Sequence, residues 1–211
     1  IGTDGGGLDR FDLENDRFIH FHHDPDDPKT LSGDIVATIY QDQDDMLWVG
    51  TIGSGLNRYD SETGTFTRYQ HMPGDMHSLS NNYIISVLQD REGVLWFGTF
   101  GAGINKLNTG WMNFAHYQNN ANNPNSLSDN MVRAFFEDND NSLWIGSLDR
   151  GVDRFDREND RWRNFPYNPD DPRSLSNSFV SAMYEDRSGV LWIGTASGLD
   201  RFEPETGTFT H

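Results

Sequence analysis

The sequence contains no cysteine, few basic residues and no long apolar run, and each shortage excludes a class of protein. Without cysteine the chain can form neither a disulfide nor a thiolate metal site. Lys and Arg number 16 against 33 Asp and Glu, and the resulting net charge of −17 disfavours binding to nucleic acid and to anionic membranes. No apolar stretch approaches the length of a membrane-spanning helix. The remaining ligand classes are cations and neutral polar molecules such as sugars.

What the chain has in abundance is one phrase that returns every 48 residues. A Leu-Trp pair, an apolar residue, Gly and then Thr or Ser occurs four times, and the chain begins inside a fifth copy. The glycines of this phrase are Gly2, Gly50, Gly98, Gly146 and Gly194. A period in the forties, built from short strand-like segments, is typical of a β-propeller. Positions shared by all copies are explained by that architecture, so function is to be sought where the copies differ.

Each copy predicts four antiparallel strands, which make one propeller blade. In one copy the expected strands cover 83–88, 94–99, 104–107 and 114–117, followed by a crossover from 118 to 128. The first turn of each copy has a residue that tolerates positive φ, as a type I turn with a bulge requires; these residues are Asp45, Gly93, Asn141 and Gly189. The outer hairpin has Asp16, Gly64, Asp160 and Gly207 in equivalent places, and the third copy departs from this pattern at 109–113.

We therefore expect an all-β chain whose residues 1–211 form part of a β-propeller. The first blade, 1–30, lacks its inner strand, and further blades cover 31–78, 79–126, 127–174 and 175–211. Because an open ring exposes apolar faces and strand edges, we expect the chain to belong to a larger propeller. Further blades, or a second copy of the chain, would close the ring.

The repeated aromatic and basic residues have structural interpretations. One Trp per blade is expected to fill the space between neighbouring sheets; these are Trp48, Trp96, Trp144 and Trp192. The basic residues of the third strand are expected to pair with acidic neighbours; these are Arg10, Arg58, Lys106, Arg154 and Arg201. The conspicuous tryptophans are thus core residues and not ligand platforms.

Three segments resemble the two-component regulator propeller repeat: GSGLNRYDSETGTFTRYQH at 53–71, NPDDPRSLSNSFVSAMYEDRSGVLWIGT at 168–195 and GLDRFEPETGTFTH at 198–211. The resemblance covers essentially the whole chain, in about four and a half copies. It implies a seven-bladed propeller in the periplasmic or extracellular sensor region of a hybrid histidine kinase or diguanylate cyclase. The role it implies is ligand sensing in a membrane-bound two-component or related signal transduction system.

The candidate ligand-binding residues lie where the copies differ, near the ends of the inner strands. Arg133 is a charge on an otherwise apolar strand, which could anchor a carboxylate or sulfate or else pair with an acidic neighbour. Asp149 and Arg150 replace the glycines of equivalent loops, and Phe100 offers a platform for a sugar ring. The residues predicted to bind a small polar or carbohydrate ligand are Arg133, Asp149, Arg150, Phe100, Asn82 and Asn130.

No catalytic residue, metal site or cofactor is expected. The acidic crossovers 24–28 and 169–172 lack the spacing of a calcium loop, and His20 and His22 lack a third metal ligand. No motif of a nucleophile elbow, zinc protease or phosphate loop occurs. We expect a non-catalytic sensor module that binds its ligand or mediates dimerisation. It would bind no nucleic acid and contact no membrane directly. A glycosidase or lyase, and a purely structural interaction platform, are the alternatives.

Overall fold

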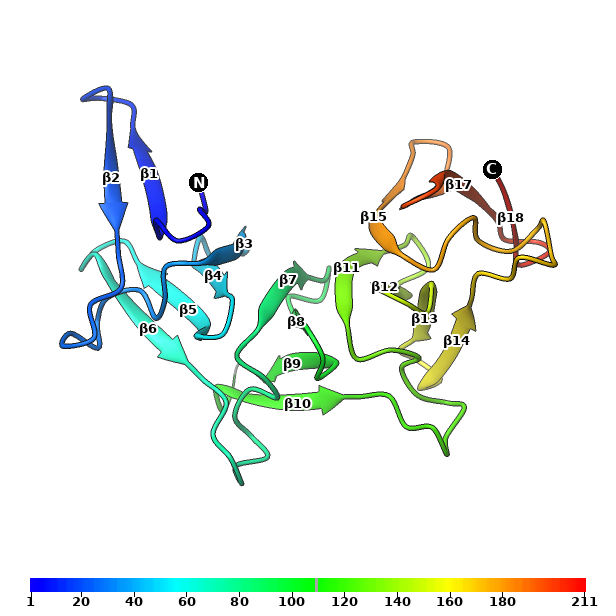
Figure 1. Ribbon diagram of the computed structural model, residues 1–211, viewed down its shortest axis with the longest axis horizontal. Helices are drawn as coiled ribbons and strands as arrows, with labels where there is room; N and C mark the ends of the chain where they lie inside the picture. The colour runs from blue at the N-terminus through cyan, green and yellow to red at the C-terminus, as the bar shows by residue number, and fades with distance from the viewer. Residues whose placement is uncertain (109) are drawn as a thin grey trace. The chain divides into compact units, whose positions relative to one another are not determined.

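The computed structural model describes residues 1–108 and 110–211, and the regular elements in them are β-strands (Figure 1). The described residues include no helix with the length and apolarity needed to cross a bilayer. Four sheets have four strands each, and within each sheet strands that are consecutive in sequence lie side by side. This confirms the predicted all-β fold of antiparallel propeller blades.

The sheets follow one another along the chain. The first complete sheet contains β3 (Val36–Gln41), β4 (Leu47–Thr51), β5 (Gly55–Asp60) and β6 (Thr65–Tyr69). The second contains β7 (Ile84–Gln89), β8 (Leu95–Thr99), β9 (Ile104–Asn108) and β10 (Asn113–Tyr117). The third contains β11 (Val132–Glu137), β12 (Leu143–Ser147), β13 (Val152–Asp156) and β14 (Arg161–Phe165). The fourth contains β15 (Val180–Glu185), β16 (Leu191–Thr195), β17 (Gly198–Glu203) and β18 (Thr208–Thr210).

Ahead of these sheets lies a two-stranded hairpin of β1 (Leu8–Asp12) and β2 (Arg17–Phe21). Gly2 forms an isolated bridge to Leu8, so the first residues run beside β1 as the second strand of a blade would. Asp4 forms another bridge to Ile35, just before β3. The seven-bladed total stays a prediction.

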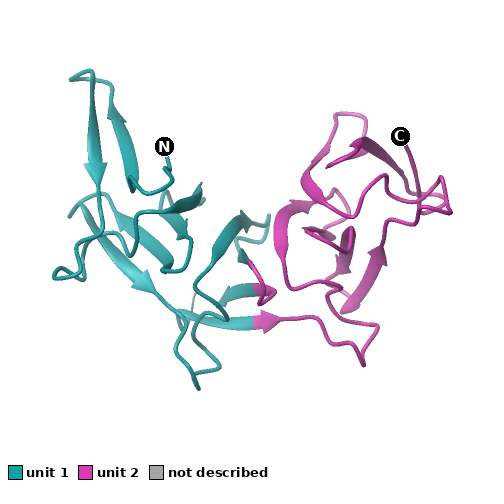
Figure 2. Ribbon diagram, viewed as in Figure 1, with its two compact units in different colours: residues 1–99, 105–115 teal, residues 100–104, 116–211 magenta. Residues whose placement is uncertain are grey.

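The chain divides into two compact units (Figure 2). Unit 1 comprises residues 1–99 and 105–115, and unit 2 comprises residues 100–104 and 116–211. Each unit has its own core, built around a buried tryptophan. In unit 1, Trp48 on β4 lies 5.5 Å from the ring of Phe97 on β8, in the following sheet. In unit 2, Trp144 on β12 lies 4.9 Å from the ring of Phe202 on β17, again in the following sheet. For Trp48 and Trp144, these contacts confirm that the repeated Trp fills the space between blades.

The turn between the first two strands of each complete blade is closed by an aspartate that recurs in every copy: Asp42, Asp90, Asp138 and Asp186. Asp138 Oδ1 accepts the backbone N–H groups of Asp140 and Ser142, at 3.0 and 2.9 Å. Its Oδ2 accepts the indole N–H of Trp144 at 2.7 Å. The Trp bond is absent from the sequence-based interpretation, and it links the turn to the core. The residues expected at positive φ have it: Asp45 at 60°, Gly93 at 83°, Asn141 at 61° and Gly189 at 79°.

The outer hairpins also turn through residues at positive φ, including Asp16 at 49° and Asp160 at 51°. In the third copy this place is taken by Met112, at φ 49°. A side chain such as Met disfavours this conformation by about 1–2 kcal/mol. Thr109, in the segment where the third copy departs from the pattern, lies outside the described residues.

Two of the repeated basic residues, Lys106 and Arg154, lie over the tryptophans of their own blades. Arg154 is opposite Trp144 in the register of β12 and β13, and its guanidinium lies 5.3 Å from the indole. Lys106 lies 5.2 Å from the ring of Trp96. The expected acidic partners are present too, because Arg154 Nη2 lies 3.1 Å from Asp138 Oδ2. The cation therefore bridges the turn carboxylate and the indole.

Candidate ligand site

A β-bulge interrupts each inner strand directly after its first residue. The register with the neighbouring strand shifts between Val132 and Ala134 in β11, and at the equivalent places in β3, β7 and β15. The bulged residues are therefore Ala37, Ile85, Arg133 and Ser181. A bulge leaves one residue outside the ladder of hydrogen bonds and re-aims its side chain. The sheet thus tolerates variation here, which explains why the copies differ at this position.

Arg133 is exposed on its bulge, and its guanidinium lies 5.1 Å from the ring centroid of Phe179. Among residues 1–108 and 110–211 it forms no ion pair, so the salt-bridge interpretation of this residue is not realised. A cation–π contact at a solvent-accessible site is worth about 0.5–1 kcal/mol. The contact orients the guanidinium while its N–H donors remain able to bind a carboxylate or sulfate.

Two loops meet at Met131, two residues before Arg133. Phe100 forms an isolated bridge with Met131, and the N–H of Leu148 donates to the Met131 carbonyl at 3.1 Å. The side chain of Phe100 is 43% exposed. The aromatic platform predicted from the sequence therefore lies beside the start of the strand that carries Arg133.

Asp149 and Arg150 lie on the exposed loop that follows Leu148. The backbone N–H of Asp149 donates to the carboxylate of Asp129 at 3.2 Å, and that of Arg150 donates to Ser147 Oγ at 2.9 Å. Asp129 also accepts the N–H of Met131 at 3.1 Å. One carboxylate thus fixes the loop to the strand start, and the side chains of Asp149 and Arg150 face solvent.

Asn82 and Asn130 brace loops. The side-chain oxygen of Asn130 accepts the N–H of Asn119 at 2.7 Å, and its carbonyl accepts the N–H of Gly101 and of Gly103. Asn82 does the same in unit 1, where its side-chain oxygen accepts the N–H of His71 at 2.7 Å. Phe100, Asn130, Arg133, Asp149 and Arg150 belong to unit 2, and Asn82 belongs to unit 1. A ligand role for the two asparagines stays a prediction.

Sequence reasoning missed a buried carboxylate on β13. Asp153 is fully buried, and it accepts hydrogen bonds from Ser128 N–H at 3.0 Å, Ser128 Oγ at 2.7 Å and Asn164 Nδ2 at 3.2 Å. Burial raises the pKa of Asp153 to about 6, because these neutral donors only partly replace water. The equivalent Asp200 instead faces His211 Nδ1 at 2.8 Å. The periodic pattern does not reveal the difference, since it depends on the residue opposite on the fourth strand.

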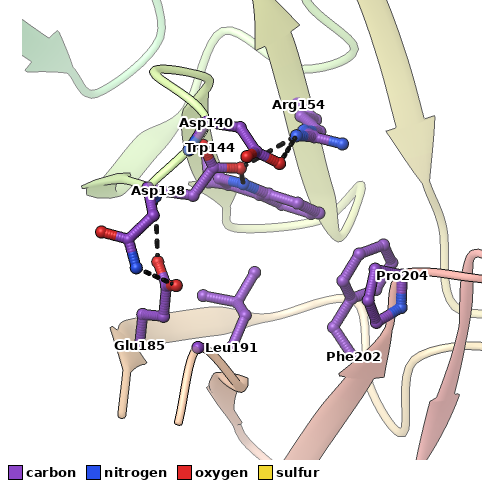
Figure 3. Close-up of a pocket in the computed structure, with 10 residues that line it drawn as sticks. Asp138, Asp140, Trp144, Arg154, Glu185, Leu191, Phe202 and Pro204 are labelled. Atoms are coloured by element: carbon purple, nitrogen blue, oxygen red, sulfur yellow. Dashed lines mark hydrogen bonds and ion pairs between the residues drawn. The ribbon is translucent and has the colours of Figure 1, made fainter. Parts of the chain in front are cut away.

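A pocket of about 180 Å³ lies at the other end of β11, next to the turn of Asp138. Figure 3 shows Asp138, Asp140, Trp144 and Arg154 on one side, with Glu185, Leu191, Phe202 and Pro204 facing them. The two sides come from consecutive blades of unit 2. Sequence analysis assigned Trp144 to the core and Arg154 to pairing with an acidic neighbour, but it could not place residues 31 or more positions apart, such as Arg154 and Glu185, around one pocket.

The carboxylates of this pocket already accept hydrogen bonds that hold the structure together. Glu185 accepts two hydrogen bonds from Asn139, one from the backbone N–H at 3.1 Å and one from the side-chain amide. Asp138 accepts hydrogen bonds from the backbone of its own turn and from the indole of Trp144. Asp140 Oδ2 lies 3.4 Å from Arg154 Nη2. The pocket therefore combines the aromatic rings of Trp144 and Phe202 with the carboxylates of Asp138, Asp140 and Glu185, which are engaged in these contacts.

The histidine pair considered in the sequence has other partners. His20 Nδ1 lies 2.6 Å from Asp9 Oδ1, and its ring stacks on that of His22 with centroids 6.2 Å apart. In the part of the chain that the structure describes, no three His, Asp or Glu side chains converge as a metal site requires.

The sequence matches the family described as two component regulator propeller. The match covers residues 30–53, 78–101, 126–149 and 174–197, which is the same 24-residue segment in four consecutive copies. Each segment runs from the crossover through the inner strand to the loop after the second strand. No curated protein matches the chain.

Solved structures resemble the chain over nearly all of its length. The extracellular domain of a protein assigned as a hybrid two-component system of B. thetaiotaomicron is 29% identical over 98% of this chain, with a TM-score of 0.84. The extracellular domain of a second B. thetaiotaomicron protein, assigned as a one-component system, is 23% identical over 98% of the chain, with a TM-score of 0.75. A GH74 enzyme of Niastella koreensis is 14% identical over 99% of the chain, with a TM-score of 0.64.

The chain spans only part of each of these proteins. It covers 27% of the first, 28% of the second and 34% of the third. The likeness to the second and third shows the propeller fold alone.

Proposed function

Because this chain is built from two-component regulator propeller repeats, we propose that it is a ligand-sensing module of a signalling protein. The observation that carries the proposal is the match along 98% of the chain to the extracellular domain of a hybrid two-component system. The location is accordingly periplasmic or extracellular. Signalling output would lie outside the propeller.

The proposed ligand is a small polar or carbohydrate molecule that carries an anionic group. Arg133 supports this chemistry, because its guanidinium rests on Phe179 and forms no ion pair within the described residues. A guanidinium binds a carboxylate or sulfate through two parallel N–H donors. Phe100 would stack on the sugar ring, and Asp149 and Arg150 would bind its hydroxyl groups. The bulge of β11 supplies the geometry, since it frees the side chain of Arg133 from the sheet.

We propose further that the module does not catalyse a reaction on its ligand. Glycoside hydrolysis requires two carboxyl groups beside the substrate, one of which gives or takes a proton. The acidic groups of the Figure 3 pocket are engaged by Trp144, Arg154 and Asn139. A product released from any glycan by the purified protein would contradict this part of the proposal.

A thermal-shift and calorimetric screen tests the proposal. Neutral oligosaccharides, uronate-containing oligosaccharides and sulfated oligosaccharides would be titrated into the protein, since a ligand that binds the native state raises the unfolding midpoint. Arg133→Ser is the informative variant, because Ser181 occupies the same bulge in the next blade. We expect it to weaken binding of the acidic glycan by about 10- to 100-fold, the loss of one charge-assisted interaction.

Arg187→Ser is the matched control. It removes one positive charge from an exposed turn at the other end of the strands, and should leave the affinity unchanged. If no glycan shifts the midpoint, or if Arg187→Ser weakens binding as much as Arg133→Ser does, the proposed ligand site is wrong.

A further inference from the structure

One outer hairpin of unit 1 differs from the other four in charge. The turn between the third and fourth strands reads DLEND at 12–16, DSETG at 60–64, DREND at 156–160 and EPETG at 203–207, with two or three carboxylates each. The third copy reads NTGWM at 108–112 and has none. Within it Trp111 is 81% exposed and Met112 is 37% exposed. An exposed indole, in a hairpin that carries carboxylates in every other copy, is the kind of surface that protein contacts use.

The crossover that contacts this hairpin's blade, which contains Met72 and Met76, is also more apolar than the other crossovers at two exposed positions. The carbonyl of His77 accepts the N–H of Phe114 at 2.9 Å, which ties the crossover to β10 just after the hairpin. Met72 and Met76, in that crossover, are 58% and 79% exposed. In the other crossovers the position of Met72 is taken by Asp24, Asn120 and Asn168. The position of Met76 is taken by Pro28, Pro124 and Pro172. We name Met72, Met76, Trp111 and Met112 the Met–Trp patch.

We propose that the Met–Trp patch is a self-association surface at which two copies of this chain meet. Each chain carries a net charge of −17, so two chains repel each other wherever their carboxylates face one another. A two-fold contact places the same patch on both sides. Any of the other outer hairpins would bring two or three carboxylates from each copy together, whereas NTGWM brings none. Met and Trp side chains are apolar and adaptable, and they pack against themselves.

The size of the patch sets the expected strength of the contact. A standard interface buries roughly 800 Å² on each partner, and four side chains cover less than that. The association is therefore weak, and a covalent trap reports it better than a dilution assay. Because the patch lies in unit 1 and the ligand residues that carry the proposed site lie in unit 2, the test needs no ligand. Its failure would leave the proposed function standing.

Single-cysteine crosslinking is the test, since the chain has no cysteine of its own. Gly110→Cys places a thiol beside Trp111 and keeps the indole. The backbone of Gly110 is not in the positive-φ region, and a Cβ there meets only Asn108 Oδ1, at an ordinary 3.5 Å. Glu62→Cys is the matched control, because Glu62 holds the same place in the outer hairpin of the preceding blade and is exposed. Both proteins would be treated with a short bismaleimide at low micromolar concentration.

We expect Gly110→Cys to give at least tenfold more crosslinked dimer than Glu62→Cys. The double variant Gly110→Cys/Trp111→Ser should fall to the level of the control. Equal crosslinking by the two single variants would overturn the proposal, and so would undiminished dimer from the double variant. Sedimentation equilibrium of the cysteine-free chain and of Trp111→Ser gives a second readout. The proposal requires that the parent associate more strongly than the variant.

Discussion

The third strand of each complete blade carries one buried side chain, Asn or Asp, that accepts a hydrogen bond from a backbone N–H at the end of the crossover. Asn57 accepts the N–H of Ser32 at 2.8 Å in one blade, and Asp153 accepts that of Ser128 at 3.0 Å in another. An amide oxygen can accept this N–H without carrying a charge. A buried carboxylate loses its hydration, and hydrogen bonds or an opposite charge must offset that loss. Asp200 has a histidine opposite it, and Asp153 has only Asn164. The two buried acids therefore differ in the side chain that faces them, which is Asn164 on β14 for Asp153 and His211 directly after β18 for Asp200.

Asp153→Asn should stabilise the protein at neutral pH and leave it little changed in acid. Burial raises the pKa of Asp153 from 3.8 to about 6, so the folded state binds this proton more tightly than the unfolded state does. The penalty is absent below pH 4, grows as pH rises through 4 to 6, and is complete above pH 6. A shift of about two units corresponds to about 3 kcal/mol. Urea unfolding at pH 4 and pH 7.5 measures the difference between variant and parent.

Asp200→Asn is the control for this prediction. It removes a carboxylate that pairs with His211, so it should lower stability where Asp153→Asn raises it. An Asp153→Asn variant whose free energy of unfolding tracks that of the parent at both pH values would show that the buried charge is not penalised.

At the scale of the element, the unit that repeats is a hairpin locked to the core by its aspartate. Asp90 Oδ1 accepts the N–H of Val94 at 2.8 Å, and Oδ2 accepts the indole of Trp96 at 2.8 Å. In the last blade the same bond from Trp192 lowers the pKa of Asp186, so the carboxyl is held in its ionised form. One carboxylate thus couples the conformation of the turn to the position of the buried indole.

Asp90→Ala should cost more stability than Asp186→Ala. Asp90 is fully buried, and its loss leaves a buried indole N–H and two turn amides without their acceptor. Such a loss is worth about 3 kcal/mol. Asp186 is partly exposed, and water can replace its oxygen atoms, so the loss there should be smaller. Urea midpoints of the two variants measure this, and equal losses would mean that burial of the carboxylate does not set the cost.

Local features of these hairpins were predictable, and features that depend on pairing were not. Asp45 and Asn141 could be assigned positive φ because turn chemistry lies within four residues. The bulge at Arg133 could not, since it is defined by the register against β12. The pocket of Asp138 and Glu185 also escaped, because its two sides come from different blades. The sequence pointed to Arg133 as a ligand residue, but its partner Phe179 required the structure.

On the scale of the whole molecule, the dominant quantity is the net charge of −17. Several ion pairs of the described residues are exposed, among them Arg17 with Asp12 and Arg173 with Asp171, and such pairs contribute little. The acidic outer hairpins carry more carboxylates than these pairs neutralise, so like charges remain close together within them. Self-repulsion of this kind destabilises the folded state, and salt relieves it.

The unfolding midpoint should therefore rise with ionic strength. Between 10 and 150 mM NaCl the Debye length falls from about 30 to about 8 Å, which removes repulsion between blades more than attraction within close pairs. A gain of about 1 kcal/mol would raise the midpoint by roughly 2–4 °C for a chain of this size. A midpoint that falls with salt would show that ion pairs outweigh repulsion. Calcium chloride at matched ionic strength separates screening from specific binding by acidic crossovers such as 24–28. Screening alone predicts the same midpoint for both salts, because it depends on ionic strength and not on coordination.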